Sequence, residues 1–411
     1  AFDLSGGDED PWNLLVEDPK KPAFLQTPVL KEHKKEKRDP SEIDLLVRAK
    51  NHSVKVTFSD DVEEWLYALI GTQTSNGFMG RGNYGVMRMN GGFNSRICVG
   101  VYKELTWNHR WQKDLALITQ RRVRDAHTEK DLAKLLWLLP WNGDSQLSLS
   151  EVDIDAIEIC RILRFKISPE GGLYILSTPS KKARIQHKGS KGLVGDPWTP
   201  EVKEDTGEGT KALALGKRGI TYSFICKTLL HTVNPSLAQQ LPGERTGYLW
   251  IEGLVRGEGK TKLFHSKVLE VPLRAIRRSQ DTHERWVKLS RGMLEDVNIM
   301  RLDILRDSIL MMVQLPEDGK IRRKNAFEAY PYTNLLEKKM ETAFLSFLFE
   351  NGDDKDARVR WQSYLKEIGL EILNLAKKNL GLPLTKKYRA YSAGDRYFFI
   401  SFYEKFPSLK G

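Results

Sequence analysis

Two short patterns in the sequence carry residue types that could bind a nucleotide. Residues 80–85 read GRGNYG and fit the GxGxxG spacing of a dinucleotide loop. That fingerprint needs a strand before it and a helix after it, whereas here a helical pattern precedes and more glycine loop follows. Gly259-Lys260-Thr261 matches the end of a phosphate-binding P-loop, but Leu254 stands where the first glycine is required. Neither pattern therefore predicts a nucleotide site.

The histidines and cysteines form no catalytic or metal-binding pattern. The eight histidines include no HxxxH or HExxH pair, and Cys98, Cys160 and Cys226 stand far apart. Cysteine zinc sites use paired CxxC spacing, and hydrolase serines sit in a GxSxG elbow that is absent here. Asn108-His109 lacks the rest of an HNH-type metal hairpin. We predict no metal, no cofactor and no enzymatic activity; a metal-dependent nuclease would need a carboxylate cluster that the sequence does not show.

Two other segments have the composition of contact surfaces for an acidic ligand. Residues 71–100 hold seven glycines between Gly71 and Gly92, mixed with Asn, Ser and Arg. We interpret this stretch as a long glycine-rich loop, because glycine lets a backbone approach a ligand closely. Residues 180–200 form a second loop, rich in basic side chains and glycine and without an acid before Asp196.

The elements that must position these loops follow from hydrophobic periodicity. Residues 60–71 predict a helix that begins at the two aspartates and ends at Gly71, and residues 115–140 predict another. β-branched and aromatic runs predict strands at 173–177, 248–255 and 262–271.

The C-terminal third has a different, helical pattern. Residues 281–314 carry a stripe that we expect to be core: Trp286, Leu289, Met293, Val297, Met300, Ile304 and Leu305. Segments 333–350, 354–380 and 390–406 predict three more helices joined by short loops. The predicted fold class is α+β, with a mixed N-terminal domain over 1–278 and a four-helix bundle over 279–411.

Composition limits the class of protein. The chain has 411 residues, 40% of them hydrophobic, and a formal net charge of +11. This content can build a core, so general disorder is excluded, and no apolar run approaches the ~20 residues of a membrane helix. The N-terminal residues show no signal peptide, and the sparse cysteines fit a reducing compartment, so we expect a cytoplasmic protein without a membrane partner.

Several ordered strings together resemble one known family. They are PAFLQTP at 22–28, DLLVRAKNH at 44–52, NYG through MNGGFNSR at 83–96, GDPWTP at 195–200, and WIEGLVRG at 250–257 with Gly259-Lys260-Thr261 close behind. These strings are similar to the CasA family, the large subunits of type I-E CRISPR surveillance complexes (Cascade). The resemblance spans roughly residues 20–270, and the helical tail also matches, since that family ends in a four-helix bundle.

The resemblance implies a non-catalytic role in antiviral defence. Such subunits recognise the protospacer-adjacent motif (PAM) in double-stranded DNA, help to open the duplex for R-loop formation, and present the DNA to a helicase-nuclease. Base pairing then reads the remaining sequence, as is general for RNA-guided recognition. The implied partners are target duplex DNA, the CRISPR guide RNA, the backbone, guide 5′-end-binding and small subunits of the ribonucleoprotein, and the effector nuclease.

The resemblance also implies site residues. The glycine loop that reads the minor groove corresponds to Asn90, Gly91, Gly92, Phe93 and Asn94. Its companion lysine falls in the basic loop, at Lys188 or Lys191. The wedge belongs to the hairpin Val255–Val268, which contains no glutamine, so Phe264 and His265 are the candidates, with Lys260 as a further DNA contact.

The sequence leaves two alternatives open. Asn76, Arg81, Asn83 and Arg88 are predicted to contact either the guide RNA or a neighbouring subunit. The chain as a whole is either a motif-reading DNA-binding subunit or a structural subunit that only completes the ribonucleoprotein and docks partners, through exposed bundle lysines such as Lys338, Lys339, Lys377 and Lys378.

Overall fold

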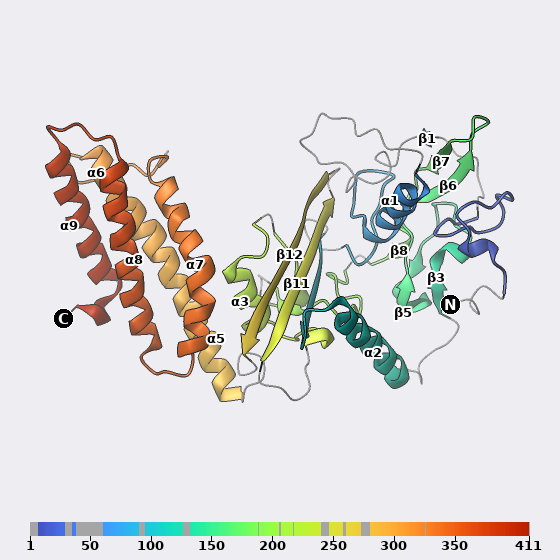
Figure 1. Cartoon of the computed structure of the whole chain (residues 1–411), viewed down its shortest axis with the longest axis horizontal. Helices are drawn as coiled ribbons and strands as arrows, with labels where there is room; N and C mark the ends of the chain where they lie inside the picture. Colours follow the sequence, from blue (N-terminus) through green and yellow to red (C-terminus); the bar gives the residue numbers. More distant parts are fainter. Residues whose placement is uncertain are drawn as a thin grey trace. The chain divides into compact units, whose positions relative to one another are not determined.

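The fold is given by a computed structural model with two compact units (Figure 1). One unit comprises Ala1–Ile220 and Thr232–Val271, and the other comprises Thr221–His231 and Pro272–Gly411. The predicted boundary after residue 278 stays a prediction. The structure describes residues 7–28, 35–37, 61–89, 95–125, 132–187, 189–204, 207–216, 218–239, 246–257, 260–272, 280–324 and 326–410.

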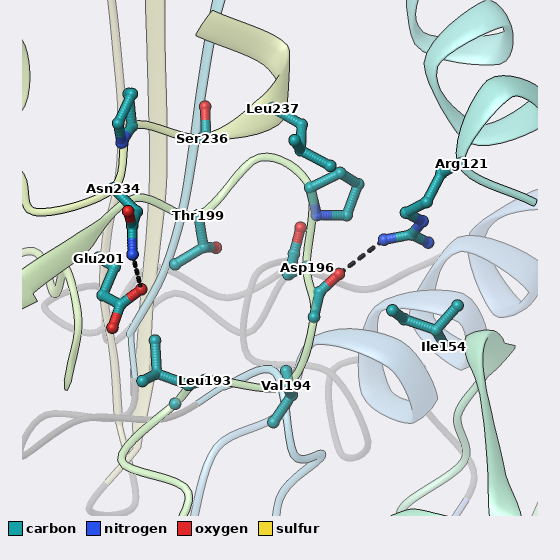
Figure 2. Close-up of a pocket in the computed structure, with 14 residues that line it drawn as sticks. Arg121, Ile154, Leu193, Val194, Asp196, Thr199, Glu201, Asn234, Ser236 and Leu237 are labelled. Atoms are coloured by element: carbon teal, nitrogen blue, oxygen red, sulfur yellow. Dashed lines mark hydrogen bonds between the residues drawn. The ribbon is translucent and has the colours of Figure 1, made fainter. Parts of the chain in front are cut away.

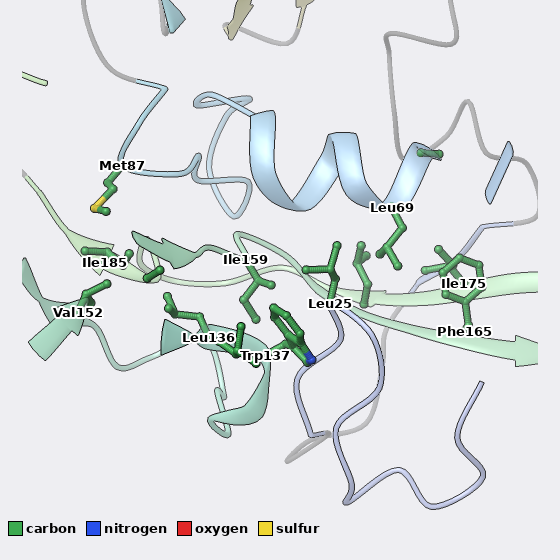
Figure 3. Packing of buried hydrophobic residues seen from close by; sticks show 14 of the residues in the cluster. Leu25, Leu69, Met87, Leu136, Trp137, Val152, Ile159, Phe165, Ile175 and Ile185 are labelled. Carbon is green, nitrogen blue, oxygen red and sulfur yellow. The ribbon is translucent and has the colours of Figure 1, made fainter. Parts of the chain in front are cut away.

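Helix α1, Val62–Ser75, covers part of the core of the first unit (Figure 3). Asp61 caps it, because a carboxylate oxygen accepts from the Glu63 amide at 2.9 Å. The predicted end at Gly71 is wrong. The helix continues because Gln73 is fully buried and its side-chain amide donates to the Leu25 carbonyl at 2.7 Å.

Three strands in antiparallel order β1-β7-β6 lie against this core, with bounds Lys35–Lys37, Leu173–Thr178 and Ile162–Ile167. Phe165 of β6 meets Trp65 of α1 edge to face, with ring centroids 5.5 Å apart. Figure 3 shows Phe165 and Ile175 side by side beneath the α1 residue Leu69. The strand predicted at 173–177 is confirmed.

Short strand pairs complete the periphery of this unit. The parallel pairs are β3 with β5, Ala133–Leu135 and Val152–Ile157, and β4 with β8, Leu147–Ser148 and Ile185–Gln186. The antiparallel pair is β9 with β10, Glu201–Lys203 and Thr210–Ala212.

The helix predicted over 115–140 is wrong in both bounds. Helix α2 spans Trp107–Asp125, and residues 133–138 form β3 and a 3-10 turn. The apolar run around Leu136 and Trp137 has no helical period, and both side chains are fully buried in the core cluster. The Trp137 indole donates to the Pro11 carbonyl at 3.0 Å, a contact between distant parts of the chain that local patterning does not encode.

A second sheet has the order β12-β11-β2 (Figure 1). β11 spans Thr246–Gly257 and β12 spans Lys260–Pro272, which confirms the strands predicted there. β2, Ser95–Tyr102, pairs antiparallel with β11 from Ser95 opposite Val255 to Tyr102 opposite Tyr248. The prediction of loop through residue 100 is therefore wrong for Ser95–Gly100, where alternating Ile97 and Val99 are buried.

The second unit is helical. α5 (Gln280–Ile299) and α6 (Arg306–Gln314) are joined by a π-helical turn, Met300–Leu305, and are followed by α7 (Tyr330–Asn351), α8 (Ala357–Asn379) and α9 (Lys387–Lys405). The four predicted helical segments are thus present. Six of the seven stripe residues are buried, and Leu289 is half-buried.

Close packing joins these helices. A β-carbon at Gly394 of α9 would lie 2.4 Å from the Met312 side chain of α6, so only glycine allows this approach. Helix α3, Tyr222–Leu230, also packs on α5 and α7, although it precedes β11 in sequence. The predicted α+β fold class is confirmed. Across the described part of the chain, every helix is too short or too polar to cross a membrane.

Candidate nucleic-acid interface

The predicted glycine loop, residues 90–94, lies outside the described residues, but the residues that border it are firmly anchored. Met89 and Ser95 are only 2% and 4% exposed. Met89 belongs to a small apolar cluster against which Leu254 of β11 packs. Ser95 pairs with Val255, two residues before the end of β11. Both ends of the glycine segment are therefore held beside the end of β11 that leads into the β11–β12 hairpin turn.

The hairpin separates the two wedge candidates. Lys260 begins β12, and nothing is described of its side chain. Phe264 is 58% exposed, whereas His265 is half-buried. Successive strand residues face opposite sides of a sheet, so these two side chains do not act on one base step. The His265 ring lies against Gly219, where an added β-carbon would meet it at 2.6 Å.

The two lysines predicted in the basic loop are Lys188 and Lys191. Lys188 lies outside the described residues. Lys191 has a left-handed backbone with φ of 52°, and its carbonyl accepts from the Ala212 amide at 3.0 Å. Its ammonium pairs with the Glu204 carboxylate while its side chain remains 52% exposed.

Arg96 and Asp196 connect the two loops. The Arg96 guanidinium donates to Asp196 at 3.0 Å, one residue beyond the buried Ser95. Asp196 in turn accepts from the Trp198 amide at 3.1 Å, which closes the Asp-Pro-Trp turn. Burial lowers the pKa of Arg96, but Asp196, Cys98 and Glu158 together raise it more, so the pKa lies above its ordinary value. Sequence reasoning missed this pair, and its one signal was the turn-forming Asp-Pro dipeptide.

The four residues predicted to contact RNA or a subunit divide into two classes. Arg81 and Asn83 are exposed, while Asn76 is buried. The Arg88 guanidinium donates to Glu158 at 2.7 Å and to the carbonyl of Ile154 at 2.7 Å. Its side chain is 12% exposed, so Arg88 holds the preceding loop on the core rather than facing a ligand.

A cavity of about 380 Å³ lies beside the basic loop (Figure 2). Arg121 of α2 donates to the Gly195 carbonyl at 2.6 Å, and Asn234 donates to Glu201 at 2.6 Å. Hydrogen bonds from Thr210 and Asn234 lower the pKa of Glu201. The wall of this cavity includes the carboxylates of Asp196 and Glu201, which disfavour a phosphate as ligand.

The described residues contain no group of three or more His, Cys, Asp or Glu side chains arranged to hold a metal ion.

This architecture was compared with those of known proteins. No family model and no curated protein matches the sequence. Solved structures do match the fold. CasA from Thermus thermophilus aligns with a TM-score of 0.60 at 14% identity, over 98% of this chain and 82% of that one. The CRISPR-associated protein Cse1 from Acidimicrobium ferrooxidans aligns with a TM-score of 0.54 at 12% identity, over 93% of this chain and 78% of that one.

These alignments run through both compact units, since they cover nearly the whole chain. At such low identity they establish the fold and leave the role of each residue to its own chemistry. The resemblance read from the sequence strings is confirmed at this level: the chain has the fold of the CasA/Cse1 proteins.

Proposed function

We propose that this chain is the non-catalytic large subunit of an RNA-guided CRISPR surveillance complex, in which it recognises the protospacer-adjacent motif in duplex DNA. It then destabilises the adjacent duplex for R-loop formation and presents the DNA to a nuclease. The observation that carries this proposal is the convergence, within a CasA fold, of three predicted contact segments around the start of β2.

Each segment contributes a different chemistry. The glycine segment is anchored at Met89 and Ser95, and it offers backbone N–H groups with no side chain at Gly91 and Gly92. Such groups reach acceptors in the narrow minor groove, where the code is degenerate and several motifs are tolerated. The hairpin and the basic loop flank this point and supply an aromatic ring and cations.

Phe264 is the wedge that the geometry favours. Its ring is 58% exposed on a strand at the edge of the described sheet, and it therefore costs little to move from water into a base stack. Apolar wedges unstack base steps at a cost of about a few kcal/mol each. His265 instead supports the hairpin through its contact with Gly219.

The test uses the guide-RNA complex assembled with and without this chain. Binding is measured to duplexes whose guide-matched site is constant and whose flanking base pairs are randomised. We expect binding to require the chain and to select particular flanks. Binding that needs the chain but ignores the flanks would instead favour the structural subunit that only completes the ribonucleoprotein.

A glycine variant tests whether residues 90–94 recognise the flanking base pairs. Gly92→Val should abolish flank selection while guide-RNA assembly survives. Gly381→Val is the matched control, because an added side chain there meets no atom within 4 Å and the backbone is not left-handed. Intact flank selection in Gly92→Val would overturn the loop assignment.

A further inference from the structure

Helix α2 exposes an uncharged face. Between Trp107 and Val123 its exposed positions recur in adjacent pairs every four residues, close to the helical repeat of 3.6, so they form one continuous stripe that winds slowly around the helix. We call these residues the α2 face: Trp107, Asn108, Trp111, Gln112, Leu115, Ala116, Thr119, Gln120 and Val123. Every member is apolar, an amide or a hydroxyl.

The charged side chains that the structure describes on α2, up to Arg122, point the other way, into their own unit. Arg110 pairs with Glu252 of β11 at 2.7 Å, and Arg122 pairs with Asp153 of β5 at 2.7 Å. Lys113 donates to two backbone carbonyls, and burial lowers its pKa to about 8. The described cations of this helix, which end at Arg122, are therefore committed to internal contacts.

This arrangement is the reverse of an ordinary surface helix, which buries its apolar stripe and exposes its charges. Trp107 is 69% exposed, Trp111 65%, Leu115 46% and Val123 71%. Large exposed apolar patches mark interaction sites, and tryptophan is among the residues that dominate the energy of protein interfaces. These properties indicate that the α2 face is an interaction surface.

The missing charge identifies the class of partner. Nucleic acid requires cations that neutralise phosphates, and a helix that lies on a membrane carries lysine and arginine beside its apolar face. The α2 face has neither. Depletion of charge and enrichment in tryptophan is the composition of the centre of a protein–protein interface.

The size of the face favours a different subunit over a second copy of the chain. A helix of 19 residues is about 28 Å long, so one face about 10 Å wide offers ~300 Å². A stable interface needs about 800 Å² from each partner. Trp107, Trp111 and Leu115, spaced by four residues, instead suit a helix laid in a groove of a partner that makes further contacts elsewhere.

We propose that the α2 face docks into an apolar, uncharged groove on another protein subunit of the surveillance complex. This inference rests on the proposed function, because it requires that complex as the partner.

The test measures incorporation of the full chain into the guide-RNA complex purified without it. Trp111→Glu places a charge at the centre of the face and should weaken incorporation by at least about 10-fold, as expected for a tryptophan anchor. Trp111→Ala should weaken it less but in the same direction. Tyr67→Glu is the matched control, since Tyr67 is a 68% exposed aromatic residue on α1, and it should join the complex like the parent chain.

The outcomes separate this proposal from the proposed function. A parent chain that fails to join the complex overturns the proposed function and this inference with it. A parent chain and a folded Trp111→Glu variant that join equally well overturn the inference alone. So does a Trp111-dependent homodimer, or a Trp111→Ala variant that loses affinity for the free guide RNA in isolation.

Discussion

Arg96 is the residue that ties the two predicted DNA-contacting loops together. It follows the glycine segment by two positions and reaches Asp196, within the basic loop, across 100 residues of sequence. The carboxylate side chain is 3% exposed and the arginine side chain 30%. An ion pair this far from water depends on both partners, because either charge alone would be buried without compensation.

Replacing Arg96 with Met tests this dependence. We expect the free energy of unfolding of the first unit to fall by about 2 kcal/mol, less than the ~3–5 kcal/mol lost when a fully buried pair is broken. Urea denaturation measures it. The double variant Arg96→Met/Asp196→Asn should recover part of the loss, through a coupling of about 1–2 kcal/mol. Strictly additive losses would show that the two side chains do not stabilise each other.

The β11–β12 hairpin packs against one glycine outside it, Gly219, through the His265 ring. Gly219 has φ of 72°, and a β-carbon there would meet the His265 ring at 2.6 Å. Gly171 has φ of 90° in the β6–β7 turn, and a β-carbon there would meet nothing within 4 Å. Both positions therefore have a left-handed backbone, but only at Gly219 would an added β-carbon meet another side chain.

This pair gives a matched comparison. Gly171→Ala should lower the free energy of unfolding by about 1–2 kcal/mol, the cost of a left-handed backbone in an L-residue. Gly219→Ala should lower it by about 1 kcal/mol more, because the His265 ring must move. Urea unfolding of both variants measures the difference. Equal losses would mean that the ring yields without cost and does not hold the hairpin.

His231, at the C-terminal end of helix α3, contacts Ser290 of α5. The Ser290 hydroxyl donates to the Val287 carbonyl, so His231 Nε2–H donates to the Ser290 oxygen, at 3.0 Å. Burial lowers the pKa of His231 to about 4, and the cations of Arg291 and Lys227 act in the same direction.

This shift predicts a pH dependence of stability. At pH 7 the imidazole is neutral in the folded chain and mostly neutral in the unfolded chain. Below about pH 6.5 the unfolded chain takes up a proton that the folded chain refuses, so the free energy of unfolding falls until the pH reaches about 4. We expect a loss of about 1–2 kcal/mol between pH 7 and 5 that His231→Gln removes. Urea unfolding at both pH values measures it, and an equal pH dependence in the variant would contradict the assignment.

At the scale of the whole molecule, the pairing of cations within the chain limits how many remain for the proposed contacts with phosphate. The net charge of +11 favours association with nucleic acid, yet many cations are already paired inside the chain. Lys191 is an intermediate case, because half of its side chain is exposed although its ammonium is paired with the Glu204 carboxylate.

Salt dependence of duplex binding by the assembled complex measures this balance. Each phosphate neutralised contributes about 0.9 to the slope of log K against log salt concentration. Lys191→Gln should reduce the slope by about that amount, and Glu204→Gln should raise affinity because it releases the ammonium. Unchanged slope and affinity in both variants would make Lys191 structural. A flat slope for the parent complex would favour the docking-only subunit.

Local patterning alone determined a substantial part of this fold. The stripe from Trp286 to Leu305 predicted the long helix of the second unit, because helical periodicity is a property of neighbouring residues. The strands at 248–255 and 262–271 followed from β-branched and aromatic runs in the same way.

Tertiary structure decided what depends on residues far apart in sequence. Gln73 extends α1 past Gly71 because its amide finds a carbonyl 48 residues away, and Ser95–Gly100 become a strand because β11 offers them a partner. The pairing of Arg96 with Asp196 has the same origin.

Helix α2 shows most clearly why periodicity was insufficient. Trp107 and Trp111 have the spacing of a core stripe, yet they face solvent while Arg110 and Lys113 face the protein. Periodicity identifies which residues share a face, but only the positions of acids and carbonyls on the surrounding elements decide which face turns inward.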